Sequence, residues 1–314
     1  MLRKLMLFAL FLMICLPTLS LLAQDSTSIP ACPTAPAPDV IGAHNLTLES
    51  SGVKRDYILY VPVSYDPTTP TALVMSFHGR TSNPFQQTVV SGWNLLAEQQ
   101  GVIVAYPAGL GTPSQWNTQI PTRRRPNEDV IFVNDLIDTL SKQFCIDPTR
   151  VYANGLSNGG GISNLLACVL SDRIAAIGGV AGAYIGTERR CNPDRPVPVI
   201  AFHGTADTVV SYAGGPSKSF DYNFPSVPGW AADWATHNGC DARSLEIPAT
   251  GDVSGVHYTH CDEGADVIFY TIDGGGHTWP GGFPIPAFGK TSTDINATAT
   301  VWAFFAAHPL PTKK

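Results

Sequence analysis

Charged residues are scarce in this sequence, and their shortage excludes two classes of protein. Asp, Glu, Lys and Arg make up only 14% of the 314 residues, whereas hydrophobic residues make up 44%. So large an apolar share excludes a disordered chain and is enough for one large core. The largest basic cluster is three arginines at residues 123–125, in a chain whose net charge is −6. The sequence therefore lacks the basic patch that binding to nucleic acid requires, and we expect these arginines to lie in a solvated loop.

Long apolar runs are also missing beyond the N-terminus, so no later segment is expected to span a membrane. The chain begins with Arg3 and Lys4, followed by an apolar run over residues 5–16 and then Pro17. This pattern predicts a cleaved secretory signal over residues 1–23. An uncleaved anchor is the less favoured alternative, because the run is short of the ~20 residues that a spanning helix needs. Cleavage removes two positive charges and no negative ones, so the net charge of −6 becomes −8.

The sequence has no C-x-x-C pair, which argues against a zinc site or a redox motif. One of the seven cysteines, Cys15, falls in the signal. The even number that remains in an exported chain predicts disulfides. We favour a bond between Cys240 and Cys261, because both flank one loop between an expected helix and an expected strand. The other pairings stay open among Cys32, Cys145, Cys168 and Cys191.

Neither an internal repeat nor a long linker divides the chain. We therefore expect one domain over residues 39–314, preceded by an extended Pro/Ser/Thr-rich leader at 24–38. Within it, β-branched runs alternate with segments of helical periodicity. Strands are expected over residues 55–62, 72–79, 101–109, 150–157, 174–182, 197–207 and 265–273, and helices over 92–100, 127–140, 158–170, 230–237 and 294–307. This alternation predicts an α/β fold with a mostly parallel central sheet and helices on both faces.

In such a sheet, ligands bind beyond the carboxyl ends of the strands, and a serine stands at one of these ends. Ser157 lies in the stretch VYANGLSNGGG, between a strand-like run and a helix-like run. A sharp strand-to-helix turn needs small neighbours, which Gly155 and Gly159 supply. Because G-x-S-x-G alone is a weak signal, an ordinary turn serine is the alternative. The strand before it and the helix after it favour Ser157 as a nucleophile.

Two further strand ends carry a carboxylate and an imidazole. Asp207 follows an apolar strand and could hold a histidine, although an aspartate that caps its own turn is an equal alternative. His277 lies in the glycine-rich stretch DGGGHTWPGG after the last strand. The chain order Ser, Asp, His matches the α/β-hydrolase arrangement of a catalytic triad. Weaker candidates are Asp266 and Asp273 for the acid, and His78 and His203, which we expect to pack or to shape loops.

A serine hydrolase also needs an oxyanion hole, formed by backbone N–H groups. One donor is expected from Asn158, the residue after the nucleophile. The second should come from the loop after an early strand, here FHGRTSN. We favour the N–H of Arg80, with Thr81 as the alternative.

Five stretches together resemble one known family. FHGR, EDVIFVNDLID, CIDPTRVYANGLSNGG, HGTADTVVSY and GGGHTWPGG are similar to the secreted polyhydroxybutyrate depolymerase and feruloyl esterase family of α/β-hydrolases, over roughly residues 52–308. The resemblance implies a serine esterase with no metal or cofactor, and a triad of Ser157, Asp207 and His277. It also implies a structural role for Asp129, and Trp116 and Trp279 as aromatic residues that line the substrate cleft.

The chain departs from the family pattern in two ways. Arg80 stands where many relatives carry cysteine, which alters the wall and the charge of the cleft. No separate substrate-binding domain is expected, which argues against efficient attack on solid polyester. The remaining tryptophans, Trp93, Trp230, Trp234 and Trp302, lie within helical patterns and are expected in the core.

These observations predict an exported, monomeric serine esterase that needs neither nucleic acid nor a membrane partner. The favoured substrates are hydroxyalkanoate or aliphatic polyester oligomers. A feruloyl or acetyl ester on plant polysaccharide is the main alternative, and a peptidase of the same fold is a weaker one. A non-catalytic binding protein of the same fold is the remaining alternative, which three intact triad residues disfavour.

Overall fold

The computed structural model describes residues 32–33, 41–184, 191–217 and 222–311. The predicted signal at residues 1–23 lies outside the described residues, as does the predicted leader at 24–38 apart from Cys32 and Pro33. In the part of the chain that is described, no helix has both the length and the apolar character needed to cross a membrane.

Twelve strands are assigned in the described part of the chain. In chain order they are β1 Gly42–Ser50, β2 Val53–Val61, β3 Thr71–Phe77, β4 Ile103–Pro107, β5 Ile146–Leu156, β6 Ile177–Val180, β7 Val199–Gly204, β8 Gly215–Pro216, β9 Asn223–Phe224, β10 Leu245–Thr250, β11 Val253–Tyr258 and β12 Val267–Ile272. Ten of them form one sheet in the order β1-β2-β4-β3-β5-β6-β7-β12-β11-β10, and β8 pairs with β9. The run from β4 to β12 is parallel, which confirms the predicted mostly parallel sheet.

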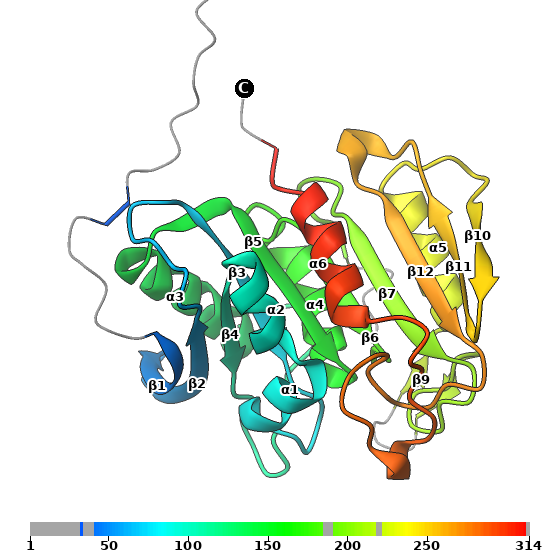
Figure 1. The fold of residues 1–314 in the computed structure, drawn as a ribbon, viewed down its shortest axis with the longest axis horizontal. Coiled ribbons are helices and arrows are strands. Elements are labelled where there is room, and N and C mark those ends of the chain that lie inside the picture. Colours follow the sequence, from blue (N-terminus) through cyan, green and yellow to red (C-terminus); the bar gives the residue numbers. More distant parts are fainter. Residues whose placement is uncertain (1–31, 34–40, 185–190, 218–221, 312–314) are drawn as a thin grey trace, which may run out of the picture.

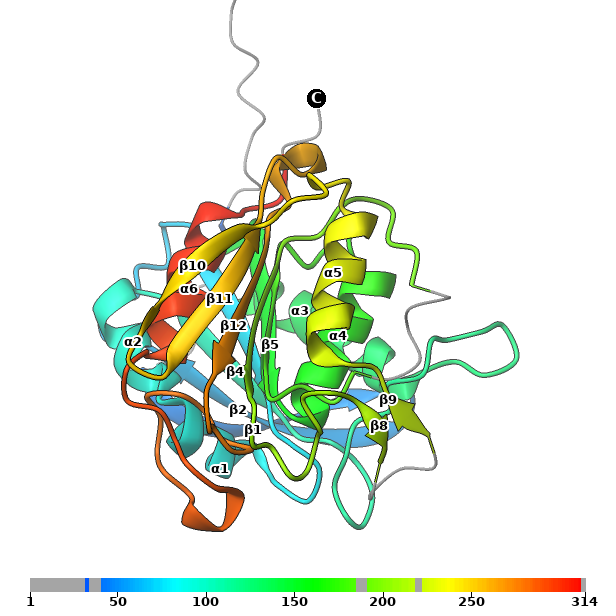
Figure 2. The same cartoon turned by 90° about the vertical axis from the view of Figure 1, so that its right-hand side faces the viewer.

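Helices cover both faces of the sheet, as the alternation of elements predicts (Figures 1 and 2). They are α1 Pro84–Ser91, α2 Trp93–Gln100, α3 Glu128–Gln143, α4 Asn158–Val169, α5 Val227–His237 and α6 Ala297–Ala307, with short 3-10 turns at Asp262–Gly264 and Pro286–Phe288. The apolar sides of α3, α4 and α5 pack into one core, and those of α1, α2 and α6 pack into another on the opposite face. The tryptophans expected in the core, Trp93, Trp230, Trp234 and Trp302, are buried there.

Every predicted strand and helix has a counterpart, but the prediction missed the elements at the edges. β1, β10, β11 and α1 were not expected, nor was the short β8–β9 pair. The edge strand β10 has exposed side chains at nearly every position, and it contains Pro248. An edge strand with so little buried surface leaves almost no hydrophobic pattern in the sequence.

Three disulfides join the described cysteines: Cys32–Cys145, Cys168–Cys191 and Cys240–Cys261. The predicted pairing of Cys240 with Cys261 is therefore confirmed. Its stated reason was wrong, because the two cysteines flank the β10–β11 hairpin and not a loop. The arginines at residues 123–125 are exposed in a loop, as expected.

Candidate active site

Ser157 lies at the turn between the end of β5 and the start of α4. Its backbone has φ 56° and ψ −120°, a left-handed conformation that a residue with a side chain rarely adopts. A Cβ at Gly159 would collide with the carbonyl oxygen of Phe77, and one at Gly155 would collide with the backbone of Gly159. Both flanking glycines are therefore required by close approach of the backbone, as the turn motif predicts.

Asp207 and His277 come from loops after β7 and β12 and meet in the interior. Nδ1 of His277 lies 2.7 Å from Oδ2 of Asp207, and both residues are buried. The other carboxylate oxygen, Oδ1, accepts hydrogen bonds from the backbone N–H groups of Val209 (2.8 Å) and Val210 (2.9 Å). Asp207 thus caps its own turn and also holds the imidazole, so the two interpretations of this residue are compatible.

The hydrogen-bond partners of Asp207 stabilise its ionised form. Burial alone raises the pKa of a carboxyl group, but hydrogen bonds from His203 and His277 outweigh it and hold the pKa of Asp207 well below its ordinary value. The rival carboxylates are engaged elsewhere, since Asp266 bonds His257 at 2.8 Å and Asp273 accepts from the hydroxyl of Thr205 at 3.3 Å.

Ser157 and His277 line the same cavity, which has a volume of about 530 Å³. Its walls are mainly apolar, and most of the apolar side chains come from α1, the turn after Asp207 and the loop after His277. The apolar side chains of these walls include Phe85, Val89, Val209, Val210, Phe283 and Phe288. Phe85 and Phe283 are 66% and 59% exposed, so the rim of the cavity presents aromatic rings to solvent. This cavity can accept an apolar group beside the hydroxyl of Ser157.

The loop after β3 also lines this cavity and narrows the choice of oxyanion donors. The N–H of Thr81 donates to the carbonyl of Ser114 at 2.8 Å, so it is already used and the alternative donor is ruled out. Arg80 lines the cavity, and its Nε donates to the side chain of Gln115 at 3.1 Å. Asn158 begins α4, where helix N–H groups are unpaired within the helix, and its side-chain amide is tied to the backbone of Trp116.

The expectation that Trp116 and Trp279 line the substrate cleft is contradicted for the cavity that holds Ser157, although Trp116 lines a neighbouring cavity. They are 3% and 1% exposed, and neither lines the cavity that holds Ser157. The indole N–H of Trp116 donates to the carbonyl of His78 at 2.9 Å, and that of Trp279 donates to the hydroxyl of Thr298 at 2.9 Å. The neighbouring Gly and Pro residues correctly indicated that both tryptophans lie in loops. They carried no information on whether those loops pack against the core.

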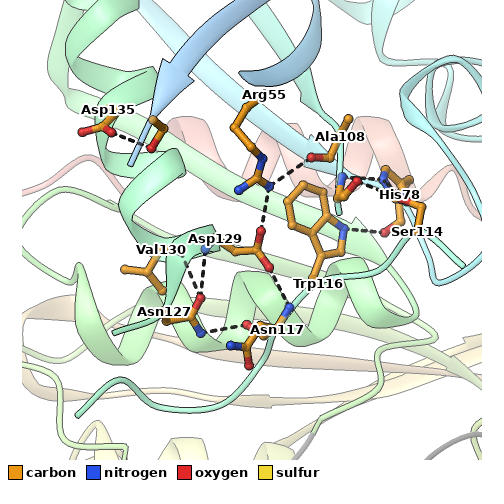
Figure 3. Close-up of polar contacts among 12 residues, drawn as sticks. Arg55, His78, Ala108, Ser114, Trp116, Asn117, Asn127, Asp129, Val130 and Asp135 are labelled. Atoms are coloured by element: carbon orange, nitrogen blue, oxygen red, sulfur yellow. Dashed lines mark hydrogen bonds and ion pairs between the residues drawn. The ribbon is translucent and has the colours of Figure 1, made fainter. Parts of the chain in front are cut away.

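Asp129 has the structural role that the family resemblance implies (Figure 3). Its Oδ1 is 2.6 Å from Nη2 of Arg55, a buried ion pair between α3 and β2. Its Oδ2 accepts from the N–H of Asn117 at 2.7 Å. Asn127 caps α3 and donates to the carbonyl groups of Asn117 and Gln119. Together these contacts fix the loop that carries Trp116, whose backbone is hydrogen-bonded to the side chain of Asn158, the residue after Ser157.

His78 and His203, the weaker histidine candidates of the sequence analysis, differ in their roles. His78 shapes a loop as expected, because its Nε2 accepts from the N–H of Gly109 at 3.0 Å, and burial lowers the pKa of His78. His203 does more than the sequence suggested. Its Nε2 lies 2.9 Å from the carbonyl of Val210 and 3.3 Å from Oδ2 of Asp207. The spacing His-x-x-x-Asp at the end of a strand was the available signal for this contact.

The chain resembles known esterases over most of its length. Its residues 55–194 match the family model described as esterase PHB depolymerase. Feruloyl esterase B of Piromyces equi is 31% identical over 229 residues, which cover 71% of this chain and 42% of that enzyme, so the chain spans less than half of that relative's length. The putative esterase NocK of Nocardia uniformis subsp. tsuyamanensis is 30% identical over 256 residues, which cover 75% of this chain and 73% of that protein.

Solved structures agree on the fold. An acetyl xylan esterase from Aspergillus awamori superimposes with a TM-score of 0.58 over 84% of this chain and 99% of that chain, at 16% sequence identity. With the parallel sheet, the helices on both faces and the strand–serine–helix turn, this likeness identifies the α/β-hydrolase fold. The chain belongs to the esterase PHB depolymerase family.

Proposed function

We propose that this chain is an exported serine esterase that hydrolyses carboxylic esters through Ser157, His277 and Asp207. The observation that carries the proposal is the cavity that Ser157 and His277 share. Ser157 lies there on a strained turn, and His277 is hydrogen-bonded to the buried Asp207. A binding module has no need for an imidazole oriented by a buried carboxylate beside a strained serine. A catalytic role is therefore favoured over a non-catalytic one.

The proposed reaction proceeds in two acyl-transfer steps. Nε2 of His277 takes the proton of Ser157 as the serine oxygen bonds to the ester carbonyl carbon, and Asp207 stabilises the imidazolium. The N–H groups of Asn158 and Arg80 would hold the oxyanion, and the bond to the alcohol oxygen breaks as His277 returns its proton to the leaving alcohol. Water then attacks the acyl-serine in the same manner, which releases the acid and restores Ser157.

The favoured substrates are esters of hydroxyalkanoates or other aliphatic acids, as in polyhydroxybutyrate oligomers. The apolar walls of the cavity and the exposed rings of Phe85 and Phe283 at its rim support an apolar acyl group.

A feruloyl or acetyl ester on polysaccharide is the second candidate, and one observation favours it. A more polar cavity of about 560 Å³ lies across the Arg80–Gln115 contact, and its lining includes Gln115, Asn117, Gln119 and Glu128 together with Trp116. Amide and carboxylate side chains of this kind hydrogen-bond hydroxyl groups, so this cavity suits a sugar on the alcohol side. The names of the relatives, a feruloyl esterase and an acetyl xylan esterase, point the same way.

Export is supported by the three disulfides, which persist in oxidising compartments. The acidic net charge of −6 favours a protein that works without nucleic acid.

Labelling of Ser157 tests the proposal. We expect a fluorophosphonate to label the intact protein at Ser157, and S157A to lose both labelling and hydrolysis of nitrophenyl acetate. Undiminished hydrolysis by S157A would show that another group is the nucleophile. A panel of hydroxybutyrate oligomers, methyl ferulate and acetylated xylan then separates the two substrate classes by kcat/KM.

A further inference from the structure

His203 stands out among the buried polar residues because it contacts the acid of the proposed triad. It is the penultimate residue of β7, and its side chain is fully buried. Its Nε2 faces two oxygens, the carbonyl of Val210 at 2.9 Å and Oδ2 of Asp207 at 3.3 Å. Because both oxygens are acceptors, Nε2 must carry the proton.

The other ring nitrogen, Nδ1, does not explain why a histidine occupies this position. Nδ1 of His203 is buried and has no hydrogen-bond partner among the described residues. A buried polar atom without a partner destabilises a fold, and an apolar side chain of similar size would avoid this. Packing alone therefore does not account for a histidine at this position, whereas its N–H on Asp207 does.

The contact completes the set of donors around Asp207. Oδ1 accepts two backbone N–H groups from Val209 and Val210, and Oδ2 accepts the N–H of His277 at 2.7 Å and that of His203. With donors on both oxygens the carboxylate cannot rotate, so one lone pair of Oδ2 stays directed at Nδ1 of His277. The second donor also shares the negative charge that Oδ2 offers to His277.

The same N–H reaches the wall of the cavity. Val210 accepts from His203 through its carbonyl and donates to Asp207 through its N–H, while the side chains of Val209 and Val210 line the cavity with Ser157. His203 therefore ties together the carboxylate and the cavity wall. Apart from Asp207 and His277, the titratable side chain that the described residues bring against it is Tyr212, whose ring centre is 6.2 Å away.

We propose that His203 is a positioning residue for the esterase reaction: its Nε2–H fixes the orientation of Asp207 and limits the charge that Asp207 presents to His277. This inference rests on the proposed function, since it assigns His203 a role in the same triad.

The test compares two substitutions of similar length. His203→Gln keeps an N–H donor at the end of the side chain, whereas His203→Met removes it. In H203M we expect kcat to fall roughly tenfold, in line with the loss of an outer hydrogen-bond partner in metal sites. We also expect the acid limb of the kcat/KM profile to move to higher pH, because Oδ2 then stabilises the His277 imidazolium more strongly. H203Q should recover most of kcat and return the acid limb toward the wild-type position.

Matched controls are H257M and H257Q, because His257 also bonds an aspartate, Asp266, but lies on β11 away from the cavity. Both should keep the wild-type profile. The proposal is overturned if folded H203M keeps the wild-type acid limb, or if H203Q and H203M lose activity equally. If neither variant folds, nitrogen-15 NMR of the wild-type histidines decides, and an Nε2 of His203 that carries no proton overturns the proposal.

These readouts separate two kinds of failure. Persistent hydrolysis by S157A contradicts the esterase proposal itself, whatever the His203 variants do. Loss of activity in S157A with an unshifted acid limb in H203M contradicts the role of His203 alone.

Discussion

At the scale of single residues, the sequence predicted which side chains lie at strand ends but not what surrounds them. Ser157, Asp207 and His277 could be singled out because each follows an apolar run in a chain that alternates strands and helices. The contact of His203 with Asp207 depends on how the turn at residues 207–210 folds back, and periodicity carries no such information. For the same reason the burial of Trp116 and Trp279 could not be predicted from their glycine-rich surroundings.

The hydrogen bonds on Asp207 predict how stability depends on pH. Because the pKa of this carboxyl is held below its unfolded value of about 3.9, the ionised group stabilises the folded state fully at pH values above the unfolded pKa. That contribution declines as the pH falls below about 4 toward the folded pKa.

Asp207→Asn should therefore lower the free energy of unfolding by about 1.5–3 kcal/mol at pH 7, the range for hydrogen bonds to a charged group. The loss relative to wild type should shrink as the pH drops from about 5 to 3. Urea denaturation at several pH values measures this, with D233N at an exposed position on α5 as the control for the substitution itself. An equal loss at pH 3 and pH 7 would contradict the assigned pKa shift.

At the scale of elements, the helix α3 shows what sequence can and cannot predict. Its start near Asn127 and its apolar face were predicted from helical periodicity, and the structure confirms both, with Asn127 as the capping residue of a helix that begins at Glu128. The buried pair of Asp129 with Arg55 was not predicted from the residues, because the two lie on elements 74 positions apart and share no local pattern. Only the family resemblance pointed to a structural role for Asp129.

Removal of one partner from this pair should be strongly destabilising. Asp129→Asn leaves the guanidinium of Arg55 buried without its counter-ion, and it weakens the anchor of the loop that carries Trp116. We expect a loss of about 3–5 kcal/mol in the free energy of unfolding. D138N is the matched control, because Asp138 lies on the same helix as Asp129 and pairs with Arg173, but its side chain is 47% exposed. Its loss should therefore stay within about 1 kcal/mol. Equal losses in the two variants, measured by urea denaturation, would contradict a special role for the buried pair.

At the scale of the whole molecule, the parallel centre of the sheet was predictable and its antiparallel edges were not. The central strands are buried on both faces and read as continuous apolar runs, as β3 and β4 do. The edge strand β1 alternates between half-buried and exposed residues, but only Leu46 and Leu48 are large apolar residues on its half-buried side, so the apolar alternation is too short to indicate a strand. The disulfides belong to this scale as well, because Cys32–Cys145 closes 113 residues of chain and Cys240–Cys261 closes 21.

The difference in loop length predicts an order of stabilisation. In the chain-entropy description, a disulfide stabilises by restricting the unfolded chain, and a longer loop gives the larger effect. C32S/C145S should therefore lower the free energy of unfolding more than C240S/C261S, by roughly 1.5 kcal/mol for loops of these lengths. Urea denaturation of both double variants against the oxidised wild type measures the two losses. Esterase activity of the folded variants should persist, because none of these cysteines lines the cavity of Ser157. A larger loss in C240S/C261S would mean that the β10–β11 hairpin contributes through native contacts, and loop closure would then not set the order.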